Sequence, residues 1–221
     1  MGLGMSTKES LSNSWLVLDV DGVLLDPSRG GLGAWTVEFS SHFKVNADEL
    51  RGAFFEPYWD EIVIGRREVA ATLGAVLQRL GWDFDVDEVL ACWFESDFII
   101  NHEVVDTVVA LASRGVSIAV ATNQEHRRAK FLHERLASLV PLRGFVYSAQ
   151  LGRTKRDSRF FTDAQQRLGL PTELRRVVFV DDSLSNVRSA QIAKWNAVHF
   201  DAKFDWYEHV EVLLSSNEPS G

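Results

Sequence analysis

The sequence predicts an α/β fold in which helices flank a parallel sheet and a helical domain is inserted after the first strand. Apolar, β-rich runs recur at 15–19, 116–122, 144–148, 176–182 and 196–200. Helical patterns separate the later runs, at 125–136, 158–168 and 185–193. Alternating strands and helices give a parallel sheet with right-handed crossovers, which is a Rossmann-like arrangement. The first two runs are too far apart for a single crossover helix, so the chain between them requires a structure of its own.

The first strand, Trp15–Leu18, is followed by two carboxylates and a glycine. Its apolar run does not alternate with polar residues, which is typical of a strand that is buried on both faces. Asp19 and Asp21 would repel each other and resist desolvation unless a cation or a proton lies between them. For this stretch alone, a solvated turn at the strand end is the alternative interpretation.

The insert, predicted over residues 28–100, has helical patterns throughout. Trp35, Phe39 and Phe43 lie four residues apart, which places them on one helix face. "NADE" at 46–49 and "DVDE" at 85–88 resemble capping boxes that begin helices, and Gly81 ends another. We therefore predict a catalytic core from residues 12–27 and 101–215, the helical insert between them, and flexible tails at 1–11 and 216–221.

Small polar and acidic residues follow several of the predicted strands. Thr122 and Asn123 follow the second strand, and Asp181 and Asp182 end the fourth. In parallel sheets, ligands bind beyond the carboxyl ends of the strands, so these groups and Asp19 are expected at one edge. Individually, each has a structural alternative: a threonine or an acidic pair at this position is often a helix cap.

Together, these groups match the requirements of phosphoryl transfer. The reaction needs a nucleophile, a proton donor for the leaving oxygen, and cations near the phosphoryl oxygens. A carboxylate nucleophile divides the reaction through an aspartyl phosphate, and Mg²⁺ accepts carboxylate oxygens as ligands. Thr122 offers a hydroxyl group to the phosphate. Asn123, which we expect at a helix start, offers it backbone N–H groups. Lys155 supplies the remaining positive charge.

Four stretches resemble the motifs of the haloacid dehalogenase superfamily of hydrolases, in its order and spacing. "DVDGVLLDP" is similar to its first motif, and "AVATN" to the second, a strand that ends in Thr or Ser. "SAQLGRTKRDSRFF" resembles the third motif, with Lys155 at the lysine position, and "VVFVDDSLSNVRSAQ" resembles the fourth. The insert resembles the helical cap of one branch of this superfamily, and its layout is most similar to members that hydrolyse sugar phosphates.

The resemblance implies a role for each matching residue. Asp19 would be the nucleophile, Asp21 the general acid and base, Thr122 a phosphate ligand and Lys155 a charge clamp. Mg²⁺ would be held by Asp19, the backbone carbonyl of Asp21 and Asp182, with Asp181 in support. The implied function is a Mg²⁺-dependent phosphatase that acts on a small, sugar phosphate-like monoester.

Two positions depart from the family pattern. Arg156 stands where a proline usually follows the lysine, and Lys194 stands where a glycine usually follows the fourth motif. The change at Lys194 has little cost unless its backbone requires a positive φ. Neither change removes a chemical group that the reaction needs.

The alternatives differ in what happens to the phosphoryl group. A phosphomutase of the same superfamily would return it to a sugar, and a phospho-acceptor module of the receiver type would retain it. In such receivers, however, the acidic pair precedes the acceptor and there is no cap. A dehalogenase is disfavoured, because it needs no metal, whereas Asp21, Asp181 and Asp182 together indicate a metal site. A non-catalytic interaction protein on this fold is the remaining alternative.

Within the insert, "EPYWDEIVIGRRE" at 56–68 is the stretch that we expect to contact the leaving group. Pro57 and Gly65 interrupt its helical pattern, and Trp59 and Arg66 are the predicted substrate-binding residues. The alternative is a loop between helices with an aromatic plug.

The composition limits the classes of partner. The chain has 221 residues and a net charge of −8, which disfavours binding to nucleic acid or an anionic membrane. Cys92 is the single cysteine, so the chain has no internal disulfide. The sequence contains no long apolar run and no apolar signal segment near its start. We expect a cytoplasmic monomer or homodimer whose partner is a small phosphorylated metabolite.

Overall fold

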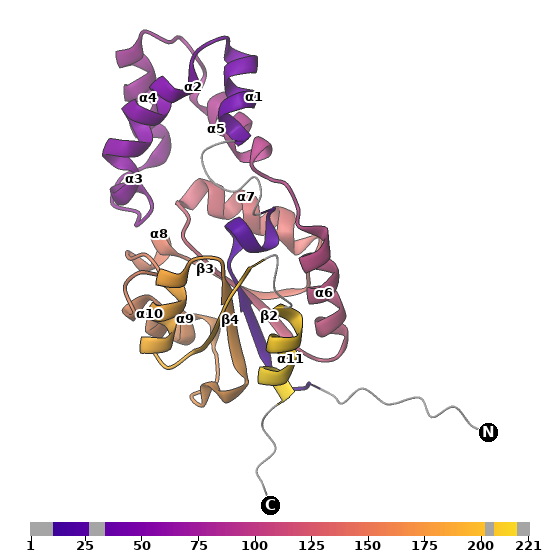
Figure 1. Cartoon of the computed structure of the whole chain (residues 1–221). Helices are drawn as coiled ribbons and strands as arrows, with labels where there is room; N and C mark the ends of the chain where they lie inside the picture. The colour runs from indigo at the N-terminus through magenta and orange to yellow at the C-terminus, as the bar shows by residue number, and fades with distance from the viewer. Residues whose placement is uncertain (1–10, 27–33, 202–205, 216–221) are drawn as a thin grey trace, which may run out of the picture.

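The computed structural model describes residues 11–26, 34–201 and 206–215, and its centre is a five-stranded parallel sheet (Figure 1). The strand order is β3-β2-β1-β4-β5, with all four pairs parallel. The strands are β1 (Trp15–Leu18), β2 (Ser117–Thr122), β3 (Leu142–Tyr147), β4 (Val177–Asp181) and β5 (Asn196–His199). This sheet confirms the predicted fold class and places β1 at its centre.

Helices cover both faces of the sheet. On one face, α6 (His102–Ser113), α7 (His126–Ala137) and α11 (Trp206–Ser215) pack against Leu16 and Leu18. On the other face, α9 (Arg159–Leu168) and α10 (Leu184–Ile192) pack against Val17. Successive side chains of a strand point to opposite faces, so β1 is apolar throughout because both of its faces are buried.

Between β1 and α6, the described residues from 34 to 96 form a group of helices above the sheet in Figure 1. They are α1 (Ala34–Phe43), α2 (Ala47–Leu50), α3 (Glu56–Ile62), α4 (Val69–Leu80) and α5 (Val86–Ser96), with a π-helical turn at Arg51–Phe55. Asn46 and Asp85 cap α2 and α5 through side-chain oxygens that accept backbone N–H groups at 3.0 Å. These helices share a hydrophobic cluster of their own, which includes Trp35 and Phe39.

The insert is held to the sheet domain at several points. The two connecting segments run side by side, with the Asp26 N–H donating to the Ile99 carbonyl at 2.7 Å. Arg127 of α7 forms ion pairs with Glu68 at 3.0 Å and Asp87 at 2.8 Å. The Ser148 hydroxyl at the start of the short helix α8 (Ser148–Leu151) donates to the Val63 carbonyl at 2.5 Å. The insert therefore covers the carboxyl ends of the strands.

Three local predictions differ from the structure. Leu11, predicted within a flexible tail, is only 3% exposed, and its N–H donates to the Arg114 carbonyl. Asn123 does not begin a helix, because Glu125 caps α7 and the helix starts at His126. Pro57 lies in the first turn of α3, where its missing N–H costs no helical hydrogen bond, so it does not interrupt the helical stretch.

Several other predictions concern positions with no structural description. The remaining tail residues (1–10 and 216–221) and the predicted start of the insert at residue 28 lie outside the described residues.

None of the described helices combines the length and the apolar character that a membrane span requires.

Lys194, where the family pattern has a glycine, adopts the left-handed conformation. Its φ is +68°, and it follows Ala193, which caps the end of α10. A residue with a Cβ atom loses about 1–2 kcal/mol in this region of backbone space. The departure from glycine therefore reduces stability but leaves the turn intact, because the Trp195 N–H still donates to the Ala190 carbonyl at 3.0 Å.

Candidate active site

The turn after β1 places Asp19 at the mouth of the sheet. The Asp19 carboxylate accepts the Val20 N–H at 2.8 Å, which fixes the side chain against its own turn. Gly22 follows with a φ of +81°, and a Cβ atom there would lie 2.2 Å from the Asp182 carboxylate. Only glycine allows the turn and the end of β4 to approach this closely.

A buried lysine joins the ends of β1 and β4. The Lys155 ammonium lies 2.6 Å from carboxylate oxygens of both Asp19 and Asp181. All three side chains are buried. The Asn123 side-chain oxygen accepts the Lys155 backbone N–H at 2.9 Å, so the loop after β2 positions the lysine.

The ionisation states of Asp19 and Lys155 depend on one another. Burial raises the pKa of Asp19 to about 7, although the nearby Lys155 ammonium opposes the effect. Burial alone would lower the pKa of Lys155, but Asp19 and Asp181 raise it above its ordinary value, so the ammonium remains charged at neutral pH. A single buried cation thus lies between two buried carboxylates, and the raised pKa of Asp19 shows that it compensates them only in part.

Three carboxylates at this mouth could hold a cation. One oxygen from each of Asp19, Asp181 and Asp182 lies within 4.8 Å of the others. Asp181 also accepts hydrogen bonds from the Ser183 N–H at 2.8 Å and the Asn186 amide at 3.0 Å, whereas Asp182 is exposed. Because every donor is an oxygen, the set fits Mg²⁺.

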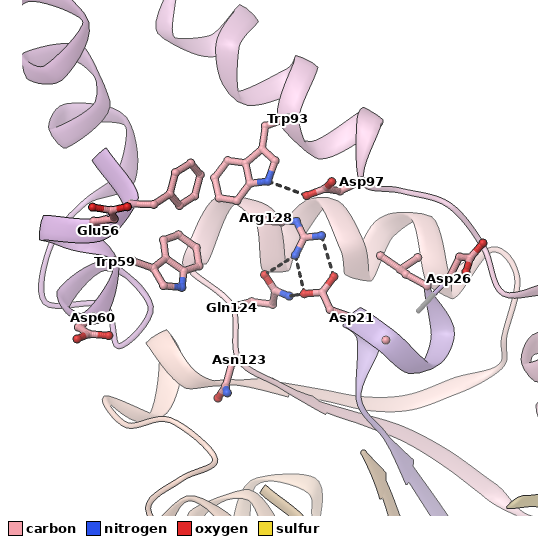
Figure 2. A pocket seen from close by; sticks show the side chains of 13 residues that line it. Asp21, Asp26, Glu56, Trp59, Asp60, Trp93, Asp97, Asn123, Gln124 and Arg128 are labelled. Carbon is pink, nitrogen blue, oxygen red and sulfur yellow. Dashed lines mark hydrogen bonds and ion pairs between the residues drawn. The ribbon is translucent and has the colours of Figure 1, made fainter. Parts of the chain in front are cut away.

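Asp21 belongs to a different network, shown in Figure 2. The guanidinium of Arg128 donates to both of its carboxylate oxygens, at 2.8 and 2.9 Å. The Gln124 amide also donates to Asp21, at 2.6 Å, and its oxygen accepts from Arg128 at 2.9 Å. Burial would raise the pKa of Asp21, but Arg128 and Gln124 together lower it below its ordinary value.

The network limits what Asp21 can do chemically. An ionised carboxylate can accept a proton, so this arrangement suits a general base. A general acid must instead carry a proton at the operating pH. The acid half of the role predicted for Asp21 therefore requires its carboxyl group to leave Arg128.

A cavity of about 440 Å³ opens between the sheet domain and the insert. Asp21, Gly22, Asn123, Gln124 and Arg128 line it from the sheet domain. From the insert and its connections come three aromatic residues, four acidic residues and one leucine: Phe55, Trp59, Trp93, Asp26, Glu56, Asp60, Asp97 and Leu25. Burial raises the pKa of Asp97 to about 6, against the effect of Arg128.

The structure brings together most of the predicted site residues. Asp19, Lys155, Asp181 and Asp182 lie at one mouth, and Thr122 is buried at the end of the neighbouring β2. Asn123 and Trp59 line the cavity. Arg66 is exposed in the turn after α3 and is not among the cavity-lining residues, so the structure does not bring it to the site.

Sequence reasoning missed three residues of the site: Gln124, Arg128 and Asn186. Gln124 and Arg128 stand four residues apart in "NQEHRR", directly after the second strand, and this spacing could have indicated a shared face. Asn186 is the asparagine of the fourth motif, and its contact with Asp181 gives that position a structural role.

A comparison with protein-family models gives a match over most of the chain. The chain matches the family model of haloacid dehalogenase-like hydrolases over residues 14–194. No curated protein matches the sequence.

Solved structures with similar folds have low sequence identity to this chain. A HAD family enzyme from Bacteroides thetaiotaomicron has a TM-score of 0.71 at 15% identity, covering 90% of this chain and 98% of its own. A second structure of it is a complex with magnesium and inorganic phosphate. A predicted HAD-like family hydrolase from Porphyromonas gingivalis has a TM-score of 0.68 at 16% sequence identity, and the match covers 91% of this chain and 98% of that protein. A 2-haloacid dehalogenase from Pseudomonas syringae has a TM-score of 0.62 at 20% sequence identity, and the match covers 87% of this chain and 89% of that protein.

The buried lysine generates a prediction about stability. Replacement of Lys155 by Met should reduce the free energy of unfolding by about 3–5 kcal/mol at neutral pH, because Asp19 and Asp181 would then be buried without a cation. Denaturant unfolding measures this loss. Lys130→Met on the exposed side of α7 is the matched control. A similar small change for both variants would contradict the charge compensation that we describe.

The Asp21–Arg128 pair generates a prediction about pH. The folded-state pKa of Asp21 lies below its unfolded value, so the pair contributes stability above about pH 4 and loses it as the pH falls further. Arg128→Met should therefore cost about 1–3 kcal/mol at pH 7 and less in acid. Unfolding of both proteins between pH 7 and 3 tests this. A difference that stays constant across that range would contradict the pairing.

Proposed function

The chain belongs to the haloacid dehalogenase-like hydrolases, and from this premise we propose that it is a phosphatase that hydrolyses a small phosphomonoester. The observation that carries the proposal is the position of Asp19. This carboxylate lies at the carboxyl end of the central strand, beside a buried ammonium and two further carboxylates. The arrangement supports attack by a carboxylate on an anionic group, because Lys155 and a metal ion held by the carboxylates would offset the charge of that group.

Asp19 is the nucleophile in this proposal. Its carboxylate oxygen attacks phosphorus, the bond from phosphorus to the alcohol oxygen breaks, and an aspartyl phosphate forms. Lys155, 2.6 Å from Asp19, opposes the effect of burial on the pKa of the nucleophile and so favours its ionised form. Its ammonium would also attract the phosphoryl oxygens. The Thr122 hydroxyl and the backbone N–H groups near Asn123 supply further hydrogen bonds to those oxygens.

Asp21 acts on protons in both halves of the reaction. In the second half it accepts a proton from water, whose oxygen attacks phosphorus and releases Asp19 and inorganic phosphate. The ionised state that Arg128 and Gln124 favour is the state that this step needs. In the first half Asp21 gives a proton to the leaving oxygen, which requires it to separate from Arg128.

Mg²⁺ is the proposed cofactor, with Asp19, the Asp21 carbonyl and Asp182 as ligands and Asp181 in support. When bound, it would neutralise charge on the phosphoryl group and on Asp19. The oxygens of Asp181 already accept hydrogen bonds from Lys155, Ser183 and Asn186, which is consistent with a supporting role. The magnesium and phosphate in the Bacteroides thetaiotaomicron complex also support this assignment.

The nature of the acidic groups favours a phosphatase over a dehalogenase. Attack on a carbon–halogen bond involves no phosphoryl charge that a cation must neutralise, so it does not require Asp181 and Asp182 to form a metal site. A phosphomutase or a phospho-acceptor module would use the same mouth but would not release phosphate into solution. Release of inorganic phosphate therefore separates the proposed function from these alternatives.

Replacement of Asp19 by Asn is expected to lower kcat for p-nitrophenyl phosphate by at least about 10³-fold, since the amide cannot attack phosphorus. Phosphate release at neutral pH with added Mg²⁺ measures this. Asp106→Asn, on the exposed side of α6, is the control and should retain full activity. Residual activity of the Asp19→Asn variant near the wild-type level would refute the assignment of the nucleophile.

Removal of divalent metal by a chelator should abolish phosphate release, and excess Mg²⁺ should restore it, because the clustered carboxylates would otherwise repel the phosphoryl group. The same assay on metal-depleted protein measures both effects. Asp182→Asn should raise the Mg²⁺ concentration that gives half-maximal activity. Turnover that is unaffected by the chelator would contradict the metal-dependent mechanism.

A further inference from the structure

The cavity between the sheet domain and the insert is where a leaving group would lie. It begins at Asp21 and Gly22, whereas Asp19 and Lys155 are not among its lining residues. If the phosphoryl group is bound at Asp19, the alcohol side of the substrate extends past Asp21 into this cavity. Its volume of about 440 Å³ is within the usual range for small-ligand pockets.

Three aromatic rings form one wall of this cavity. The ring centroids of Phe55, Trp59 and Trp93 are 5.0 to 5.7 Å apart in all three pairs. Phe55 and Trp93 are buried, and Trp59 is half-buried. In Figure 2, the side chains of Trp59 and Trp93 point toward the network of Asp21, Gln124 and Arg128. Aromatic faces attract cations, and most strongly the faces of tryptophan. The Arg128 guanidinium carbon already lies 5.9 Å from the centre of the Trp93 ring, so Trp59 is the tryptophan that a cationic ligand would contact.

The charged groups around these rings are mainly negative. Glu56 and Asp60 lie on α3 and are exposed, and Figure 2 shows them beyond the Trp59 ring, on its side away from Asp21. Asp97 follows α5 and accepts a hydrogen bond from the Trp93 indole N–H at 2.9 Å. Among the described residues, neither Glu56 nor Asp60 has a hydrogen-bonding or ion-pair partner for its side chain.

The cavity offers little positive charge in return. Arg128 is the one basic residue among the described residues that line it, and its guanidinium is already engaged by both oxygens of Asp21. The wall is therefore aromatic and net negative.

We propose that the leaving group of the substrate carries a cationic nitrogen, as in the phosphate monoester of an amino alcohol or an amino sugar. This inference rests on the proposed phosphatase activity and specifies its substrate class. A leaving group with a second anion would face Glu56, Asp60 and Asp97 without a free cation to receive it. A neutral group would fill the cavity but gain nothing from the charge of the wall, whereas an ammonium group interacts with both the carboxylates and the rings.

Two matched pairs of substrates isolate the charge of the leaving group. Phosphocholine and 3,3-dimethylbutyl phosphate have the same shape but differ in a positive charge, and glucosamine 6-phosphate and glucose 6-phosphate differ in an ammonium and a hydroxyl group. The purified full-length chain with Mg²⁺ should hydrolyse the cationic member of at least one pair with a kcat/KM about tenfold or more above its neutral partner. The pair that shows this preference distinguishes a quaternary amino alcohol from an amino sugar.

Variants of the insert test whether the cavity wall causes the preference. Glu56→Gln combined with Asp60→Asn should reduce the ratio of the two kcat/KM values at least about fivefold, because the two carboxylates are neutralised. Trp59→Leu should also reduce this ratio, because leucine has no aromatic face. Asp83→Asn, an exposed insert carboxylate outside this cavity, is the matched control and should leave the ratio unchanged. A ratio measured on one variant does not depend on its folded fraction.

The results separate failure of the inference from failure of the proposed function. Neutral members that react as well as or better than the cationic members in both pairs would overturn the inference. So would a preference that survives the Glu56 and Asp60 changes. If p-nitrophenyl phosphate is also not hydrolysed, the proposed phosphatase activity itself fails.

Discussion

The ion pairs of Lys155 are the interaction on which the rest of the site depends. Asp19 and Asp181 end two neighbouring strands, and the sheet geometry forces their carboxylates into the same buried mouth. Without a cation between them, both groups would take up protons or displace the strands. The loop that carries Lys155 is positioned in turn by Asn123, which follows the strand on the other side of β1. Residues that follow or end three of the five strands are thus joined through Lys155, and the proposed nucleophile is one of them.

The sequence was sufficient for the sheet and for the residues at its mouth, because both depend on local patterns. Buried parallel strands are apolar throughout, and parallel connections bring their carboxyl ends to one edge. Contacts between distant segments were not predictable in this way. The pairing of Asp21 with Arg128 spans more than a hundred residues of chain, and no spacing rule specifies it. Local patterns also misled at Pro57, which lies in the first turn of a helix and does not interrupt it. Arg66 is exposed and outside the cavity lining, so its predicted contact with substrate stays a prediction.

Arg128 contacts both the sheet domain and the insert, but these contacts differ in kind. Its hydrogen bonds go to Asp21 and Gln124, which belong to the sheet domain. Toward the insert, its guanidinium carbon lies 5.9 Å from the centre of the Trp93 ring. Directional hydrogen bonds to a carboxylate are stronger than a stacked contact at this distance. The ionisation of Asp21 is therefore determined mainly within the sheet domain, and movement of the insert would alter the surroundings of the pair without breaking it.

The two sides of the cavity place opposite demands on a bound molecule. At the mouth of the sheet, Lys155 and a cation held by the carboxylates would attract a phosphoryl group, while the insert presents carboxylates and aromatic faces. A molecule with a negative end and a positive end satisfies both sides in only one orientation. In the proposed mechanism, that orientation would direct phosphorus to Asp19 and the leaving oxygen to Asp21. The charge distribution would thus position the reacting bond before any movement of the insert, since electrostatic attraction acts over longer distances than packing does.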